Sequence, residues 1–424
     1  MRVIAAKGIA IIFITHRLDE VVAVADAFTV LRDGEYIASK AIRDTTVEEI
    51  AELMIGRRVE KLVDEAEDRR ILDDSRIAVR LRDYQVDMPG EQVRGVDLDI
   101  RQGEIFGIGG LAGQGKLGIP NGIMGLYEAV GEVEINGKSL NMNRLGEALR
   151  SDVAFVSEDR RGVGLLLEES IQQNIIFSAM QINGDFLTHI GPVHLYDTHR
   201  ARAHTMEMIQ RLDIRCTGPR QAAGRLSGGM KQKLGIACAL LGAPRLLLLD
   251  EPGVGVDPLS RRELWEMVGE LSRGGMTIIW STAYLDEAAR CPEILMLDEG
   301  RLLFSGPPEE MAARAGGRVF LLSPRPAERR AVLQEWTRRE GVDDVVVQGG
   351  SLRVVLHAAA PEETRAQMAR SGGVPVEPRL EDAYMSALGG MLRAPSPFGR
   401  LDSGKSPDEN AERIVARGLT KRFG

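Results

Sequence analysis

Short apolar runs, separated by polar and glycine-rich stretches, recur along this chain of 424 residues. The longest runs, residues 8–15 and Leu246–Leu249, are rich in branched residues, a pattern that predicts buried strands of a parallel sheet. Neither run approaches the roughly 18 apolar residues that a bilayer span requires. The N-terminus also lacks the charged, apolar and small-residue order of a secretion signal, so we expect an α/β protein that stays in the cytoplasm.

An internal repeat indicates how the chain is organised. The sequence THRLDE at residues 15–20 recurs as TAYLDE at residues 282–287. The flanking segments also match, with an apolar strand before each copy (residues 9–14 and 277–280) and a strand ending in a turn after it (residues 31–35 and 297–301). Because the matches stay in register across a strand–helix–strand unit, we predict parts of two related modules.

The repeat, together with the pattern and composition of the remaining residues, predicts five segments. Residues 1–62 are expected to be the C-terminal tail of a first module, and residues 75–315 a second module that is nearly whole. Residues 318–388 alternate short strands with amphipathic helices, which predicts a small α/β domain of the split βαβ kind. Residues 391–412 are rich in Pro, Ser, Gly and Asp and predict a flexible linker. Residues 413–424 resemble the first strand of a further module, so both ends look truncated.

Composition narrows the range of partners. The formal net charge is −8 and no basic stretch stands out, which argues against a nucleic-acid partner. The three cysteines, Cys216, Cys238 and Cys291, are far apart and form no C-x-x-C pair. They fit a reducing cytosol and predict neither a disulfide framework nor a zinc site.

A glycine-rich loop provides the first candidate chemistry. Residues 103–108 predict a short strand, and the loop after it has the pattern G-x-x-x-x-G-K, with Gly110, Gly113, Gly115 and Lys116. In such a loop the backbone N–H groups surround phosphate oxygens and the lysine adds a positive charge. By itself, the loop is equally well interpreted as a simple turn.

The loop departs from the phosphate-binding pattern at its last position. Leu117 stands where a serine or threonine hydroxyl would bind Mg²⁺. The helix expected after it also looks poor, because its first turns contain Gly118, Pro120 and Gly122.

Two later segments place polar groups at the ends of elements. One is a serine with two glycines at the start of a predicted helix that runs to about residue 241: Ser227, Gly228 and Gly229. Such a helix start offers a hydroxyl and free backbone donors to an anion. The other is the pair Asp250 and Glu251 after an apolar strand, which could hold Mg²⁺ and activate water as a general base. Taken alone, an ordinary N-cap and ordinary strand-end carboxylates explain them equally well.

Order and spacing remove this ambiguity. The phosphate loop, the LSGG segment at residues 226–229, the apolar strand with its two carboxylates, and residues 255–257 follow one another within one module. This succession resembles the ABC ATPase family. The resemblance implies a P-loop NTPase of ABC type, with a RecA-like core and a helical subdomain, beside the small α/β domain.

The resemblance also implies roles for particular residues. In that family two modules face each other, and each ATP lies between the phosphate loop of one and the signature of the other. ATP would then contact Gly110, Gly113, Gly115, Lys116, Ser227, Gly228 and Gly229, with Tyr84 stacked on adenine and Asp257 at the module interface. Asp250 would hold Mg²⁺ and Glu251 would be the catalytic base. His16 corresponds to the histidine that senses the γ-phosphate, and residues 156–160 replace the glutamine-bearing loop.

Two departures fall in one site, since Leu117 replaces the hydroxyl and Ala283 replaces the histidine. Losing one oriented catalytic group commonly costs on the order of 10²–10³ in rate. We therefore hypothesise an asymmetric pair of sites. The site on this module's own loop would hydrolyse ATP slowly or not at all, while the opposite site would use Ser227–Gly229 and His16.

The resemblance implies a transmembrane permease and a second nucleotide-binding module as partners, at the inner face of the cell membrane. Two subfamilies are represented. Residues 42–57 and 155–165 look like the tandem ATPases of ribose-type sugar or nucleoside importers, whereas residues 250–258 and 281–288 look like ABC-2 efflux ATPases. Two alternatives stay open, namely a non-hydrolysing regulatory module and a soluble ribosome-associated ABC ATPase.

Overall fold

The computed structural model describes most of the chain, and this description covers residues 1–5, 8–15, 18–32, 35–45, 47–55, 76–142, 144, 146–159, 164–190, 193–325, 328–348 and 350–390. The chain divides into two compact units. The central unit comprises Ala66–Met311, and the terminal unit comprises Met1–Glu65 together with Ala312–Gly424. No described helix is both long and apolar enough to cross a membrane.

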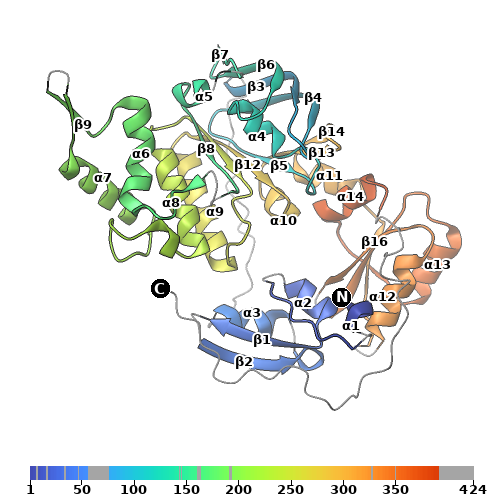
Figure 1. Cartoon of the computed structure of the whole chain (residues 1–424). Helices are drawn as coiled ribbons and strands as arrows, with labels where there is room; N and C mark the ends of the chain where they lie inside the picture. The colour runs from blue at the N-terminus through green and yellow to red at the C-terminus, as the bar shows by residue number, and fades with distance from the viewer. Residues whose placement is uncertain are drawn as a thin grey trace. The chain divides into compact units, whose positions relative to one another are not determined.

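The central unit is built on two sheets (Figure 1). The larger has the order β14-β13-β5-β12-β11-β8, with neighbours parallel except for β14, and the smaller is antiparallel with the order β4-β3-β6-β7. Their strands are β3 (Ile77–Val86), β4 (Val93–Arg101), β5 (Ile105–Gly109), β6 (Ala129–Ile135), β7 (Lys138–Ser139), β8 (Val153–Val156), β11 (Leu246–Asp250), β12 (Thr277–Thr282), β13 (Glu293–Asp298) and β14 (Arg301–Gly306).

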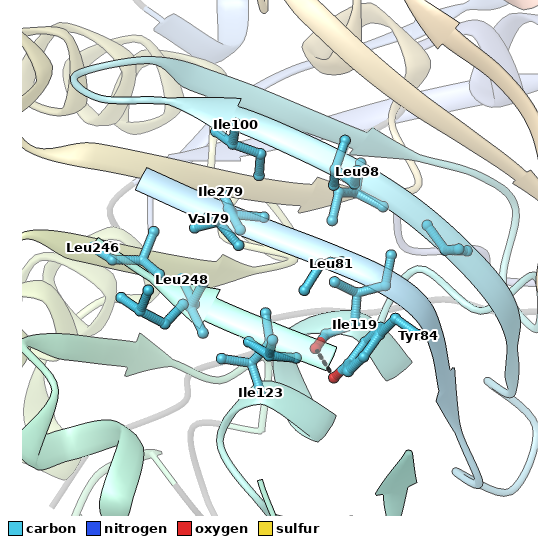
Figure 2. Packing of buried hydrophobic residues seen from close by; sticks show 14 of the residues in the cluster. Val79, Leu81, Tyr84, Leu98, Ile100, Ile119, Ile123, Leu246, Leu248 and Ile279 are labelled. Carbon is cyan, nitrogen blue, oxygen red and sulfur yellow. Dashed lines mark hydrogen bonds between the residues drawn. The ribbon is translucent and has the colours of Figure 1, made fainter. Parts of the chain in front are cut away.

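One large hydrophobic cluster of the central unit lies between these sheets. Figure 2 shows Val79 and Leu81 of β3 packed with Leu248 of β11 and Ile279 of β12. Burying one such side chain contributes about 1.5–3 kcal/mol. Every residue of β11 is buried, and the strand lies between two parallel neighbours, so the buried parallel strand predicted at Leu246–Leu249 is confirmed.

The central unit also contains several helices, most of them short. They are α4 (Gly118–Ile123), α5 (Glu147–Arg150), α6 (Ile171–Asn183), α7 (Thr198–Arg211), the 3-10 helix η3 (Ala223–Arg225), α8 (Gly228–Leu240), α9 (Pro258–Arg273), α10 (Leu285–Ala288) and α11 (Pro308–Ala313), which ends in the terminal unit. The helices α6 and α7, with the hairpin of β9 (Leu187–Ile190) and β10 (Val193–Tyr196), lie together on the side away from β3 and β4 (Figure 1). As predicted, α8 begins after Ser227. The helix after the phosphate loop, which the sequence marks as a poor one, has only 6 residues.

The terminal unit contains a hairpin that repeats one in the central unit. Its N-terminal elements are α1 (Arg2–Ala5), α2 (Leu18–Val24), β1 (Ala27–Arg32), β2 (Glu35–Ala41), the 3-10 helix η1 (Ile42–Asp44) and α3 (Val47–Ile55). In the β1–β2 hairpin the register shifts between Val30 and Leu31, and in the β13–β14 hairpin it shifts between Met296 and Leu297. Leu31 and Leu297 occupy equivalent positions of the sequence repeat. The repeat therefore extends to the position of a β-bulge.

The strand predicted at residues 9–14 is absent. Residues 9–15 form no regular element, and Ile12 and Ile14 are 71% and 92% exposed. A parallel strand is stable only when neighbouring strands accept its backbone hydrogen bonds, and no described strand pairs with this segment. The apolar pattern was interpreted correctly for residues 277–280, where β5 and β11 flank the strand β12.

Residues 319–387 form a split βαβ arrangement in the structure. The elements are β15 (Val319–Leu322), α12 (Arg329–Arg338), β16 (Val342–Gln348), β17 (Ser351–Leu356), α13 (Glu362–Arg370), β18 (Val374–Pro375) and α14 (Leu380–Ala387). The sheet order β16-β17-β15-β18 is antiparallel throughout, so β17 lies between the two strands that α12 connects. The short β18 and α14 were not predicted.

A buried ion pair attaches α14 to this sheet. Arg353 Nε donates to Asp382 Oδ1 at 2.9 Å, and Arg353 Nη2 donates to Asp382 Oδ2 at 2.6 Å. Both side chains are less than a tenth exposed, at 8% and 6%. Such a pair is costly to break from one side, because the remaining charge stays buried.

We expect Asp382→Ala to destabilise the fold of residues 319–387 by about 3–5 kcal/mol, because Arg353 is left unpaired. Native-state hydrogen exchange of β17 amides in the full chain measures this free energy of opening. The matched control is Glu363→Ala at an exposed position of α13, with a change within about 0.5 kcal/mol. A loss below about 1 kcal/mol for Asp382→Ala would contradict the role given to the ion pair.

Candidate functional site

The candidate site lies where three neighbouring parallel strands end. β12 pairs with β11 through Asp250 and Ser281, and with β5 through Gly109 and Thr282. The carboxyl ends of parallel strands meet at one edge of a sheet, which is where α/β folds place ligands. The loop that starts at Gly110 is thereby brought beside Glu251 and Ala283.

The backbone of the phosphate loop requires its glycines. Gly113 and Gly115 have φ values of 85° and 96°, a region that side-chain-bearing residues rarely occupy. A Cβ atom on Gly115 would also lie 2.5 Å from the carbonyl oxygen of Gln92. The glycines therefore allow the loop to pack against the turn between β3 and β4 and to direct its N–H groups inward.

An internal carboxylate occupies the centre of these N–H groups. Glu91 Oε1 accepts from Gly113 N at 2.6 Å, and Glu91 Oε2 accepts from Gly115 N at 2.8 Å and Leu117 N at 3.3 Å. The Glu91 carboxylate thus stands where the sequence predicts a phosphate group. Sequence reasoning missed this residue, and the only local signal was the Pro89–Gly90 turn before it.

Lys116 joins the phosphate loop to the end of β11. Its Nζ atom lies 3.2 Å from Glu251 Oε1 and 3.7 Å from Glu91 Oε1, and the whole residue is 1% exposed. Two carboxylates therefore balance one buried ammonium group. A buried charge without such partners would cost several kcal/mol.

Glu251 is held in a strained but well-defined position. Its φ is 45°, in the left-handed region that costs about 1–2 kcal/mol for a residue with a side chain. Glu251 Oε2 accepts from the backbone N of Ala283 at 3.1 Å. Burial raises the pKa of Glu251, and the charge of Lys116 opposes that rise. Strain and a raised pKa are both common at functional sites.

Asp250 offers one carboxylate oxygen for a further ligand. Its Oδ2 accepts from Asn121 Nδ2 at 3.4 Å, whereas Oδ1 is buried and no described residue hydrogen-bonds to it. Burial, and next the charge of Glu251, raises the pKa of Asp250 to about 7. Among the described residues, no group of three or more His, Cys, Asp or Glu could hold a metal ion by itself. A cation at Asp250 would therefore need ligands from a bound molecule.

The predicted signature residues form a second cluster, on α8 and α9. Ser227 is the N-cap of α8 and its Oγ accepts from Met230 N at 3.3 Å, while Gly228 and Gly229 form the first turn. Asp257 caps α9 by accepting from Ser260 N at 3.0 Å. A Cβ atom on Gly229 would lie 2.6 Å from Ser260 Oγ, so the glycine allows α8 and α9 to meet.

The structure overturns the role predicted for Tyr84. The ring is 0% exposed and its hydroxyl donates to the carbonyl oxygen of Ile119 at 3.1 Å, so no ring face is free to stack on adenine (Figure 2). The cause is a register irregularity of β3 between Leu81 and Tyr84, where Asp83 has a φ of 44°. This irregularity turns Tyr84 into the core. His16 lies outside the described residues.

Known proteins resemble this chain over part of its length. The sequence model described as ABC transporter matches residues 93–254. The probable multidrug ABC transporter ATP-binding protein YbhF of Escherichia coli (strain K12) is 43% identical over 236 residues, which cover 54% of this chain and 40% of that protein. The ribose import ATP-binding protein RbsA 2 of Rhizobium meliloti (strain 1021) is 35% identical over 305 residues, covering 71% of this chain and 57% of that protein. The chain thus spans about half the length of these relatives.

A solved structure described as the ADP conformation of an ATP-binding cassette of an ABC transporter is also similar, with a TM-score of 0.47 and 19% identity, covering 60% of this chain and 95% of that one.

The central unit has the fold of a P-loop NTPase, with a phosphate loop after β5 and two carboxylates at the end of β11. More narrowly, it resembles ABC ATPases in its fold and in its sequence over residues 93–254. Relatives of the sugar-import kind and of the multidrug kind are both present, as the two sequence resemblances predicted.

A buried carboxylate supports the segment that follows β12. Glu287 Oε2 accepts from Trp280 Nε1 at 3.1 Å and from Thr282 Oγ1 at 2.9 Å, and Glu287 Oε1 lies 3.2 Å from Arg261 Nε. These contacts fix the backbone next to Ala283, which donates to Glu251. Burial, opposed by the charge of Arg261, raises the pKa of Glu287 from 4.5 to about 7.

The raised pKa of Glu287 predicts a pH-dependent stability. Because the folded state binds this proton more tightly than the unfolded state, the stabilisation is complete below pH 4.5 and is lost as the pH rises through about 7. We expect the free energy of unfolding to fall between pH 4.5 and pH 8, and to fall by about 2 kcal/mol less in Glu287→Gln. Urea denaturation at both pH values tests this, with exposed Glu270→Gln as the control. An identical pH dependence in Glu287→Gln and wild type would refute it.

Proposed function

We propose that the central unit binds ATP with Mg²⁺, and that the chain is the ATP-binding component of an ABC transporter working with a separate transmembrane permease at the inner face of the membrane. One observation carries the proposal. The N–H groups of Gly113, Gly115 and Leu117 converge on an anion beside Lys116, and the carboxylates of β11 lie next to it. This is the arrangement that a nucleotide's phosphates require.

Each group has a defined task in this proposal. The loop N–H groups and Lys116 hold the phosphates, and Asp250 Oδ1 contributes to a Mg²⁺ site whose other ligands are phosphate oxygens and water. A bound Mg²⁺ would neutralise phosphate charge during hydrolysis. Glu251, fixed by Lys116 and by the N–H of Ala283, is placed as the general base.

The site is incomplete in two places. Leu117 offers no hydroxyl to a metal, and Ala283 offers no imidazole. Asn121 extends towards Asp250 but contacts it through the amide nitrogen, which is a donor and cannot replace the missing metal ligand. We therefore propose a transporter ATPase whose two nucleotide sites are unequal. This site binds nucleotide and turns it over slowly, while Ser227–Gly229 and Asp257 complete a site on a second module.

A second candidate function follows from the same two residues. A module that binds ATP without hydrolysing it would act as a regulatory half of a transporter. Import and efflux are both open, because RbsA 2 is described as ribose import and YbhF as probable multidrug transport.

Nucleotide binding is the first test of the proposed function. Titration of the full chain with a fluorescent ATP analogue should give saturable binding at up to millimolar concentration. Lys116→Ala should weaken this binding by at least about tenfold, because a buried charge-assisted contact to the phosphates is lost. The exposed Lys138→Ala is the matched control. Absence of saturable binding, or equal affinity in Lys116→Ala, would overturn the proposal.

Restoring the two missing groups is the test that separates a slow ATPase from a regulatory module. The double variant Leu117→Ser with Ala283→His should raise steady-state phosphate release from the full chain by on the order of 10-fold or more, because it supplies a metal ligand and an imidazole. Leu117→Ala with Ala283→Ser controls for loosened packing. Unchanged turnover with intact ATP binding would favour the regulatory reading.

A further inference from the structure

The turn that carries Glu91 is built to present this side chain to the phosphate loop. Met88, Pro89, Gly90 and Glu91 form a tight turn closed by a hydrogen bond from Glu91 N to Met88 O at 2.9 Å. Gly90 has a φ of 80°, as the third position of a type II turn requires, and proline suits the second position. The turn is therefore rigid, and its last residue points one carboxylate into the loop.

The phosphate loop in turn is shaped to receive this turn. A Cβ atom on Gly118 would lie 2.3 Å from the carbonyl oxygen of Glu91, and one on Gly115 would lie 2.5 Å from that of Gln92. Two glycines thus permit a close backbone approach that any larger residue would prevent. The Glu91 side chain is 9% exposed, so its charge is neutralised by the loop and Lys116 and hardly at all by water.

The same donors cannot serve two anions. Glu91 uses the N–H groups of Gly113, Gly115 and Leu117, and these are the groups expected to bind phosphate in a loop of this pattern. A phosphate placed there would also meet the Glu91 carboxylate at contact distance, and two adjacent negative charges repel strongly in a buried site. Nucleotide binding therefore requires the carboxylate to leave.

From this geometry we propose that Glu91 is a built-in competitor of the nucleotide's phosphates, an autoinhibitory anion that keeps the phosphate loop closed until nucleotide displaces it. The inference rests on the proposed ATP site. Displacement releases the Glu91 side chain and moves Lys116 from a carboxylate to a phosphate, so the buried ammonium stays paired in both states. The apparent affinity for nucleotide is the intrinsic affinity reduced by the fraction of molecules whose loop is open.

The test compares binding of ATP, pyrophosphate and adenosine to the full chain by calorimetry. Glu91→Gln should bind ATP and pyrophosphate about tenfold more tightly than wild type or better, because a neutral amide competes poorly with phosphate. Its affinity for adenosine should not change. Glu91→Asp, which keeps the charge but is one methylene shorter, should lie between the two. The exposed Glu128→Gln should match wild type.

Equal or weaker pyrophosphate binding by Glu91→Gln, in protein whose melting temperature matches wild type, would overturn the inference. If Glu91→Gln melts lower, Glu91→Asp decides in its place, and it must bind pyrophosphate more tightly than wild type. Pyrophosphate also separates this inference from the proposed function. Tighter pyrophosphate binding by a chain that never binds ATP would leave Glu91 as the competitor and reject the ATP site.

Discussion

The parallel pairing of β12 with both β5 and β11 is the constraint on which the candidate site depends. Its register sets Gly109 opposite Thr282 and Asp250 opposite Ser281, so the phosphate loop, the two carboxylates and Ala283 all begin at one edge of the sheet. The hydrophobic cluster between the two sheets holds these strands in place. Side chains distant in sequence are thereby held within hydrogen-bonding distance before any ligand arrives, which is the preorganisation that charge stabilisation requires.

Charge balance is the second constraint at this edge. Lys116 is buried with Glu251 on one side and Glu91 on the other, and the loop N–H groups add further positive potential. Such a cluster is stable only with an anion at its centre. In this structure Glu91, in the β3–β4 turn, supplies that anion. The strained backbone at Glu251 is tolerated because the ion pair to Lys116 and the hydrogen bond from Ala283 both depend on it.

The sequence predicted those parts of the site that are encoded locally. A buried strand ending in Asp250 and Glu251, a glycine-rich loop and an N-capped helix each have a period or turn chemistry that can be recognised. The other features of the site depend on tertiary contacts, which the local sequence does not encode. An irregularity in β3 buried Tyr84, and no strand among the described residues pairs with residues 9–14. For Glu91 the sequence offers only the Pro89–Gly90 turn before it, because its partners are contributed by a loop that only the folded sheet brings near.

The decisive measurement is a structure of the full chain with a non-hydrolysable ATP analogue and Mg²⁺. We expect the β-phosphate on the N–H groups of Gly113, Gly115 and Leu117, with Lys116 paired to phosphate, Asp250 facing the metal, and the Glu91 carboxylate displaced from the loop. Phosphates bound elsewhere, with Glu91 still accepting from the loop N–H groups, would contradict it.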